Sequence, residues 1–193
     1  MPEENNVLII HFPESSKAFE ALSQFKGQPG VRGAAVVERT ADGEVRLADG
    51  YSPEGGSGVA VGGLVGSLIG ILAGPVGVLL GWSTGMLVGG AYEADELADA
   101  DDGFTLLSRS IPAGSNALVV EMTETSHAIA DDIAKSLDGS VTRLPATEVQ
   151  AEIESAQEAA RKAAAEARKV RRAERRAEFK EKLSGLGHHR TKD

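Results

Sequence analysis

The pattern of apolar and polar positions predicts two short strand–helix–strand units that flank a long uncharged stretch. In the first unit, the apolar run 7–12 predicts a buried strand, and the helical spacing of apolar residues predicts a helix over 15–26. A second strand is expected over 31–40, and the Asp-Gly pair within 42–47 predicts a tight hairpin turn.

The second unit repeats the first after the uncharged stretch. It is expected to contain a strand over 117–122, a helix over 126–138 and a last strand over 141–144. The segments VLIIHFPESSKAF and ALVVEMTETSHAI, which begin at Val7 and Ala117, align without a gap. This repetition predicts an α+β fold, a ferredoxin-like split β-α-β duplication with an insertion between its halves.

Glycine recurs at every fourth residue through the inserted stretch, in two runs. Residues 58–90 contain 11 glycines and no charged side chain. Spacing of four places glycine on one helix face, where two backbones can approach closely. In an unsupported helix each glycine costs about 1 kcal/mol relative to alanine, so the helices need packing or lipid around them. We therefore predict a self-associating glycine zipper made by Gly58, Gly62, Gly66, Gly70 and Gly74, and then Gly77, Gly81, Gly85 and Gly89.

Gly74 and Pro75 predict the turn of a helical hairpin with arms Val59–Ala73 and Val76–Gly90, because proline breaks a helix interior. Each arm is about 22 Å long, against about 30 Å for the hydrocarbon core of a bilayer. Two interpretations follow. We expect a hairpin that inserts into or lies in the cytoplasmic membrane, with both termini cytoplasmic. The alternative is a soluble cytoplasmic homo-oligomer, a shell or filament, with the hairpins buried in its core.

Residues 147–183 predict one long helix, since neither glycine nor proline interrupts them. Apolar positions from Val149 to Val170 alternate spacings of four and three, the seam of a coiled coil, although most of them are alanine. Adjacent basic residues project about 100° apart, so their charge is expected to spread broadly around the helix. The candidate contacts for an anionic partner are Arg161, Lys162, Arg168, Lys169, Arg171, Arg172, Arg175 and Arg176.

The net charge of −9 conceals an uneven distribution. Residues 1–160 hold 24 acidic and eight basic side chains, whereas residues 161–193 hold 12 basic and five acidic ones. A basic arm on an acidic body indicates an interaction partner. The arm is expected either as a solvated helix supported by its own ion pairs, or as a contact for anionic lipid, for nucleic acid without sequence-specific reading, or for the acidic segment of a neighbouring copy. We expect an α/β half over 1–50, a linker over 51–57, the hairpin over 58–92, an acidic segment with the second α/β half over 93–146, and the arm over 147–193.

Little in the sequence suggests catalysis, a cofactor or a metal. The chain has no cysteine, which excludes disulfide scaffolds and thiolate chemistry. The acidic residues of 93–102 lack the ligand order of a calcium-binding loop, and no Gly-Lys-Ser/Thr phosphate loop is present. His11 and His127 stand alone, with surface or capping roles expected. The acidic start and short apolar run at 7–10 argue against a secretory signal.

The order of these segments resembles a widespread bacterial family of predicted membrane proteins of unknown function. The correspondence is strongest from Asp101-Asp102-Gly103-Phe104 through Ile111-Pro112-Ala113-Gly114-Ser115 to Val120, and it covers about residues 7–147. The resemblance implies a small α/β domain interrupted by a glycine-rich apolar hairpin, with the basic helix as an addition. It brings no catalytic residue or cofactor. The sequence thus predicts a non-enzymatic, self-associating protein.

Overall fold

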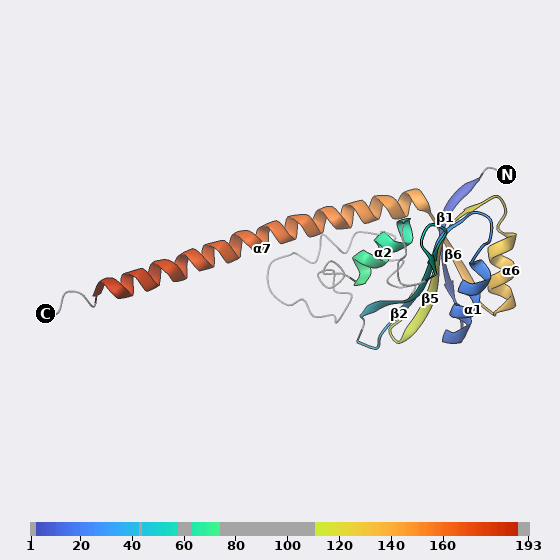
Figure 1. The fold of residues 1–193 in the computed structure, drawn as a ribbon, viewed down its shortest axis with the longest axis horizontal. Helices are drawn as coiled ribbons and strands as arrows, with labels where there is room; N and C mark the ends of the chain where they lie inside the picture. The colour runs from blue at the N-terminus through green and yellow to red at the C-terminus, as the bar shows by residue number, and fades with distance from the viewer. Residues whose placement is uncertain (1–2, 43, 58–62, 74–110, 189–193) are drawn as a thin grey trace. The chain divides into compact units, whose positions relative to one another are not determined.

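The computed structural model of the chain describes residues 3–42, 44–57, 63–73 and 111–188. The chain divides into two compact units, Met1–Ala156 and Gln157–Asp193, and each is described by itself. The first unit holds a β-sheet with helices on both faces (Figure 1). The second continues the long C-terminal helix that begins in the first unit.

Six antiparallel strands form the sheet, in the order β4-β3-β2-β5-β1-β6. The strands are β1 (Glu4–His11), β2 (Val31–Arg39), β3 (Val45–Ser52), β4 (Gly56–Ser57), β5 (Ser115–Glu124) and β6 (Ser140–Pro145). The expected α+β class is confirmed. The strand order differs from the four-strand order of a ferredoxin-like sheet, because β3 and β4 extend the sheet beyond β2.

The segment 51–57, expected as a flexible linker, belongs partly to the sheet instead. Tyr51 and Ser52 end β3, and they pair with Ser57 and Gly56 of β4. The Ser52 hydroxyl accepts a hydrogen bond from Gly55 N at 3.0 Å, which closes the turn between these two strands. Glycine-rich composition here reflects a tight hairpin rather than a free link.

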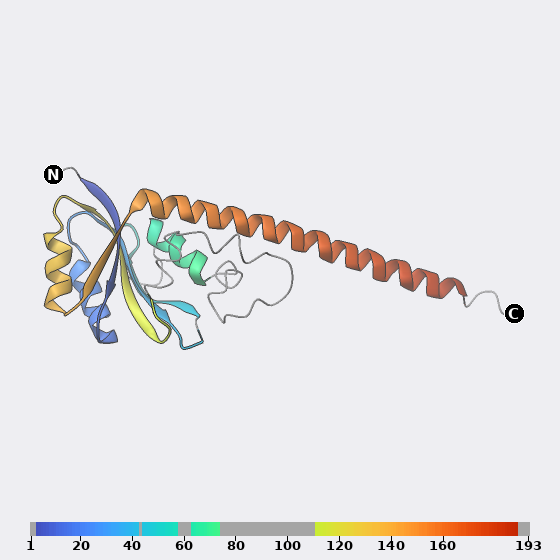
Figure 2. The ribbon, with the colours of Figure 1, turned by 180° about the vertical axis from the view of Figure 1, so that it is seen from behind.

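Helices α1 (Ser15–Phe25) and α6 (Ala128–Ser136) cover one face of the sheet. Helix α2 (Gly63–Ala73) and the first turns of α7 (Ala146–His188) cover the other (Figure 2). Alternate residues of a strand point to opposite faces, so the apolar run of β1 supplies both cores. Leu8 and Ile10 pack under α1 and α6, whereas Val7 and Ile9 pack on the α2 face.

Helix α7 is longer than expected, and its apolar seam has a different role near its start. Val149, Ile153 and Ala156 are only 3%, 2% and 8% exposed because they pack in the core on the α2 face. The first part of the predicted coiled-coil seam is therefore a contact with the protein's own sheet. Val170, further along the seam, is 56% exposed.

Candidate functional site

Helix α2 buries its large apolar side chains against the sheet. Val65, Leu68 and Leu72 are 0%, 3% and 4% exposed, and they share a core with Ala35 and Val119 of the central strands. Burial of a side chain of this size stabilises a fold by about 2 kcal/mol. The part of the predicted hairpin that the structure describes is thus seated on the α/β domain.

The opposite side of α2 is formed by small residues and is open. Ser67, Gly70 and Ala73 are exposed, and Gly66 is half-buried. A Cβ atom added at Gly70 would meet nothing within 4 Å. We call these four residues, Gly66, Ser67, Gly70 and Ala73, the glycine face. A surface without large side chains allows another helix backbone to come close, as glycine-rich helix contacts do.

A buried carboxylate holds the beginning of α2. Glu121 of β5 is 6% exposed, and its Oε2 accepts a hydrogen bond from the backbone N–H of Leu64 at 3.0 Å. The first N–H groups of a helix have no partner inside the helix and favour negative charge, so the contact suits both groups. Gly63 precedes with a φ of +68°, and a Cβ there would lie 3.1 Å from Glu121 Oε2. Glycine at 63 therefore permits the close approach.

An open cleft of about 390 Å³ lies beside this cap. Its lining combines acidic, basic, hydroxyl and apolar side chains, namely Val31, Arg32, Ser52, Pro53, Glu54, Gly63 and Glu121. The carboxylate of Glu121 already serves the helix, and the Ser52 hydroxyl already closes the β3–β4 turn. These two polar groups of the cleft thus act within the fold.

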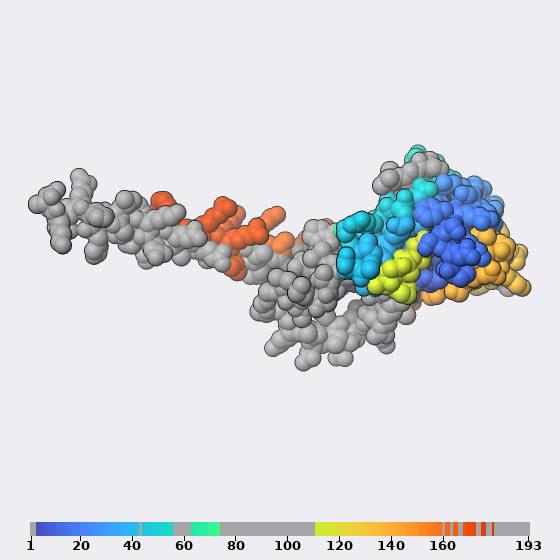
Figure 3. Space-filling model, turned by 90° about the horizontal axis from the view of Figure 1, so that it is seen from below, coloured from blue at the N-terminus to red at the C-terminus, as the bar shows by residue number. Residues whose placement is uncertain are grey.

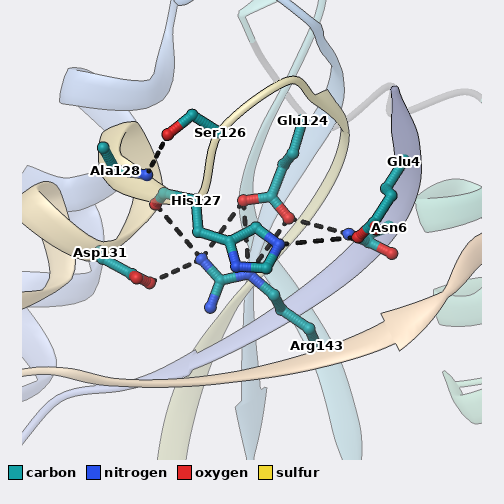
Figure 4. A network of polar contacts seen from close by, with 8 residues as sticks. All are labelled: Glu4, Asn6, Glu124, Ser126, His127, Ala128, Asp131 and Arg143. Atoms are coloured by element: carbon teal, nitrogen blue, oxygen red, sulfur yellow. Dashed lines mark hydrogen bonds and ion pairs between the residues drawn. The ribbon is translucent and has the colours of Figure 1, made fainter. Parts of the chain in front are cut away.

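A second polar cluster lies on the other face of the sheet, where β1, β5 and β6 meet the start of α6 (Figure 4). The Glu124 side chain is fully buried, and its Oε2 accepts hydrogen bonds from Asn6 Nδ2 at 2.9 Å and Arg143 Nε at 3.1 Å. Arg143 also donates from Nη2 to Asp131 Oδ1 at 2.6 Å. The guanidinium therefore joins a strand carboxylate to the helix.

The electrostatics of this cluster stabilise the charged forms. Burial by itself lowers the pKa of Arg143, but hydrogen bonds and opposite charge from Glu124 and Asp131 outweigh burial and raise it. Nearby, His127 Nε2 lies 3.6 Å from Glu4 Oε2, and the Ser126 hydroxyl accepts a hydrogen bond from Ala128 N. Each polar group of the cluster is engaged with another part of the fold, which is typical of a structural network.

The basic residues predicted to contact an anionic partner all lie on α7 in the second unit, and all eight are exposed. The described residues of this segment are coloured orange to red in Figure 3. Lys162 Nζ lies 2.8 Å from Glu158 Oε1, one turn earlier, and this pair raises the pKa of Lys162. Such an exposed pair contributes little to stability, so the basic stretch remains a solvated surface.

The structure describes two of the predicted zipper glycines, Gly66 and Gly70, and brings both to the glycine face of α2. The rest of the zipper and the predicted turn lie outside the described residues: Gly58, Gly62, Gly74, Pro75, Gly77, Gly81, Gly85 and Gly89. The sequence interpretation missed Glu121, Glu124 and Arg143. The available signal was a pair of glutamates within the otherwise apolar strand ALVVEMTE, which predicts buried partners for both.

The described residues hold neither a bilayer-spanning helix nor a cluster of metal ligands. Within 3–42, 44–57, 63–73 and 111–188, no helix combines the length and apolarity that a bilayer crossing requires. Over the same part of the chain, no group of three or more His, Asp or Glu side chains is placed to hold a metal ion. Comparisons with protein-family models, with curated proteins and with solved structures give no match.

Proposed function

We propose that this chain is a self-associating protein rather than an enzyme, and that copies meet through the glycine face of α2. The observation that carries the proposal is the orientation of α2. Its large side chains pack on the sheet, while Ser67, Gly70 and Ala73 are exposed. Glycine in a helix is less favourable than alanine by about 1 kcal/mol. Close packing of another helix on the glycine face would offset this cost and explain why glycine is present there.

The position of α2 favours a protein environment for this contact. Val65 and Leu68 lie in the core of the domain, so these residues are not available to lipid while α2 is docked. A homo-oligomer in which two glycine faces pack together keeps this core intact. Insertion of the hairpin 58–92 into the cytoplasmic membrane stays a prediction from composition.

The domain that carries α2 is proposed to be a ferredoxin-like duplication extended at one edge. If β3 and β4 are set aside, the strand order is β2-β5-β1-β6. Strand β5 then lies between β2 and β1, and strand β1 lies between β5 and β6. The units β1-α1-β2 and β5-α6-β6 then each join two strands that have one strand between them. Both helices pack on the same face, as a split β-α-β repeat requires.

The test is the size of the purified full chain by sedimentation velocity, for the wild type and for Gly70→Leu. A leucine at this open position adds bulk only to the glycine face, so we expect the fold to persist and the oligomer to dissociate. Ser23→Leu adds a comparable side chain to an exposed position of α1 and should leave the oligomer unchanged. An oligomer of wild-type size in Gly70→Leu, or a wild type that is already monomeric, would refute the proposal.

A further inference from the structure

Helix α7 carries exposed hydrophobic side chains close to its basic residues. Among the described residues, the exposed large hydrophobic side chains are Val170 and Phe179, at 56% and 65%. Both lie on α7, within or next to the basic stretch 161–176. An exposed aromatic side chain gains free energy when a partner surface removes it from water.

Helical geometry places Phe179 on the same side of α7 as most of the basic residues, three positions after Arg176, the last of the eight. With about 100° between successive residues, Arg161 falls in line with Phe179, and Arg168, Arg172 and Arg175 fall within about 40° of that line. Arg171, Lys169 and Arg176 lie within about 80°. Lys162 lies about 100° away, so the eight basic residues together span about half of the helix circumference.

The other half of the helix differs. Val170 falls about 180° from Phe179, and the positions of Glu166, Glu174 and Glu178 in the sequence fall about 100° or more away. The helix thus has a basic side with an aromatic residue at the C-terminal end of that side. We call Arg161, Arg168, Arg172, Arg175 and Phe179 the basic stripe, which extends over about 27 Å of helix.

We propose that the basic stripe binds the surface of an anionic lipid bilayer, with the arginines on the headgroups and Phe179 in the interfacial region. Each basic residue near an anionic membrane strengthens binding about fivefold. The bilayer interface also accommodates an aromatic ring, which transfers from water to the boundary between headgroups and acyl chains. Charge and apolar exposure on the same side of one helix are therefore both satisfied by this surface.

Nucleic acid fits the same observations less well. A duplex presents phosphates to the arginines but offers no apolar environment to an aromatic ring on the same side of the helix. The bases of single-stranded nucleic acid stack on aromatic side chains, but binding sites of this kind use several aromatic residues along one groove. The stripe holds one. The lipid proposal does not depend on the glycine face, since it concerns the second unit alone.

The experiment is co-sedimentation of the full chain with vesicles of phosphatidylcholine, with and without phosphatidylserine, at low salt. We compare the wild type with Phe179→Ala and with Val170→Ala as the matched control. Both residues are exposed large hydrophobics on the same helix, so neither change should disturb the fold, which circular dichroism checks. We expect binding to the phosphatidylserine vesicles, a loss of about tenfold or more in Phe179→Ala, and wild-type binding in Val170→Ala.

Other results would overturn the proposal. Equal binding to both vesicle types that Phe179→Ala leaves unchanged would assign lipid binding to another segment, such as the apolar stretch 58–90. Equal losses in the two variants would remove the stripe from the explanation, and absence of vesicle binding would remove lipid. Tighter binding to a duplex or single-stranded DNA oligonucleotide than to the anionic vesicles would identify the stripe as a nucleic-acid surface instead.

Discussion

The carboxylate of Glu121 accepts a hydrogen bond from the backbone N–H of Leu64 at 3.0 Å, although the two residues are 57 positions apart. This contact links a central strand of the sheet to the first turn of α2. It fixes where the helix begins, whereas the apolar residues of α2 fix which side faces the sheet. Together they leave the glycine face outward.

Replacement of Glu121 should reduce the stability of α2 and of the domain that holds it. Glu121→Ala leaves the Leu64 N–H without its acceptor and removes a charge from the helix N-terminus, so we expect a loss of about 1–3 kcal/mol in unfolding free energy. Urea unfolding measures the loss, and hydrogen exchange should be faster in α2 than in α1. Glu121→Gln keeps an acceptor oxygen and should lose less. Equal losses in the two variants would contradict a capping role.

The buried carboxylate of Glu124 should make Arg143 important for stability. Arg143→Met keeps an unbranched side chain but leaves Glu124 charged in the core, with Asn6 as its partner. We expect the unfolding free energy to fall by about 3 kcal/mol. The double variant Glu124→Gln with Arg143→Met should recover part of this loss, because a neutral amide is easier to bury.

Chemical denaturation of the single and double variants gives the coupling energy between these residues. Asp131→Ala serves as the control, since Asp131 pairs with the same guanidinium but its side chain is 52% exposed. Its removal should cost less than about 1 kcal/mol. A loss in Arg143→Met no larger than that of Asp131→Ala would show that the buried pair is unimportant.

His11 should make stability depend on pH. It is partly buried, its Nε2 has no hydrogen-bond partner among the described residues, and burial lowers its pKa from 6.5. The unfolded chain therefore takes up a proton at higher pH than the folded chain. The contribution of neutral His11 is complete above the unfolded pKa and is lost progressively as the pH falls from about 6.5 towards the lowered folded pKa.

Urea unfolding on both sides of this pH range tests the effect. His11→Gln removes the titrating group, so the decline in stability between about pH 7.5 and 5.5 should be smaller than in the wild type. Other titrating groups are common to the two proteins and cancel in the difference. The same decline in both would show that His11 does not protonate differently on folding.

Two glycines with the same backbone conformation should differ in their tolerance of alanine. Gly27 and Gly30 both have a φ of +82°, which costs an L-residue about 1–2 kcal/mol. A Cβ at Gly27 would meet nothing within 4 Å, whereas one at Gly30 would collide with the backbone carbonyl of Thr123. The backbone carbonyl of Gly30 also accepts a hydrogen bond from the backbone N–H of Thr123, at 2.9 Å.

We therefore expect Gly27→Ala to lose about 1–2 kcal/mol of unfolding free energy and Gly30→Ala to lose clearly more, because β2 and β5 must move apart there. Thermal or urea unfolding of the two variants gives the comparison directly. Similar losses would mean that only the left-handed backbone matters at Gly30 and that the close approach to β5 does not.

Local signals predicted the elements well. The apolar runs of β1, β2 and β5 and the helical spacing of α1, α6 and α7 were readable because strand and helix periods are properties of neighbouring residues. One helix end was misplaced in detail. The helix expected over 126–138 ends at Ser136, and Asp138 follows in the left-handed conformation (φ 57°). Glycine is required at Gly139 because a Cβ there would strike the Phe12 ring.

By itself, the sequence determined the α+β class, the positions of its main strands and helices, and the glycine spacing that suggests self-association. The tertiary structure alone decided that β3 and β4 extend the sheet and that Gly70 faces outward from α2. It also decided that Glu121 and Glu124 are buried with partners on opposite faces. These features depend on pairing between residues far apart in the chain, whereas periodicity reports only which neighbours share a face.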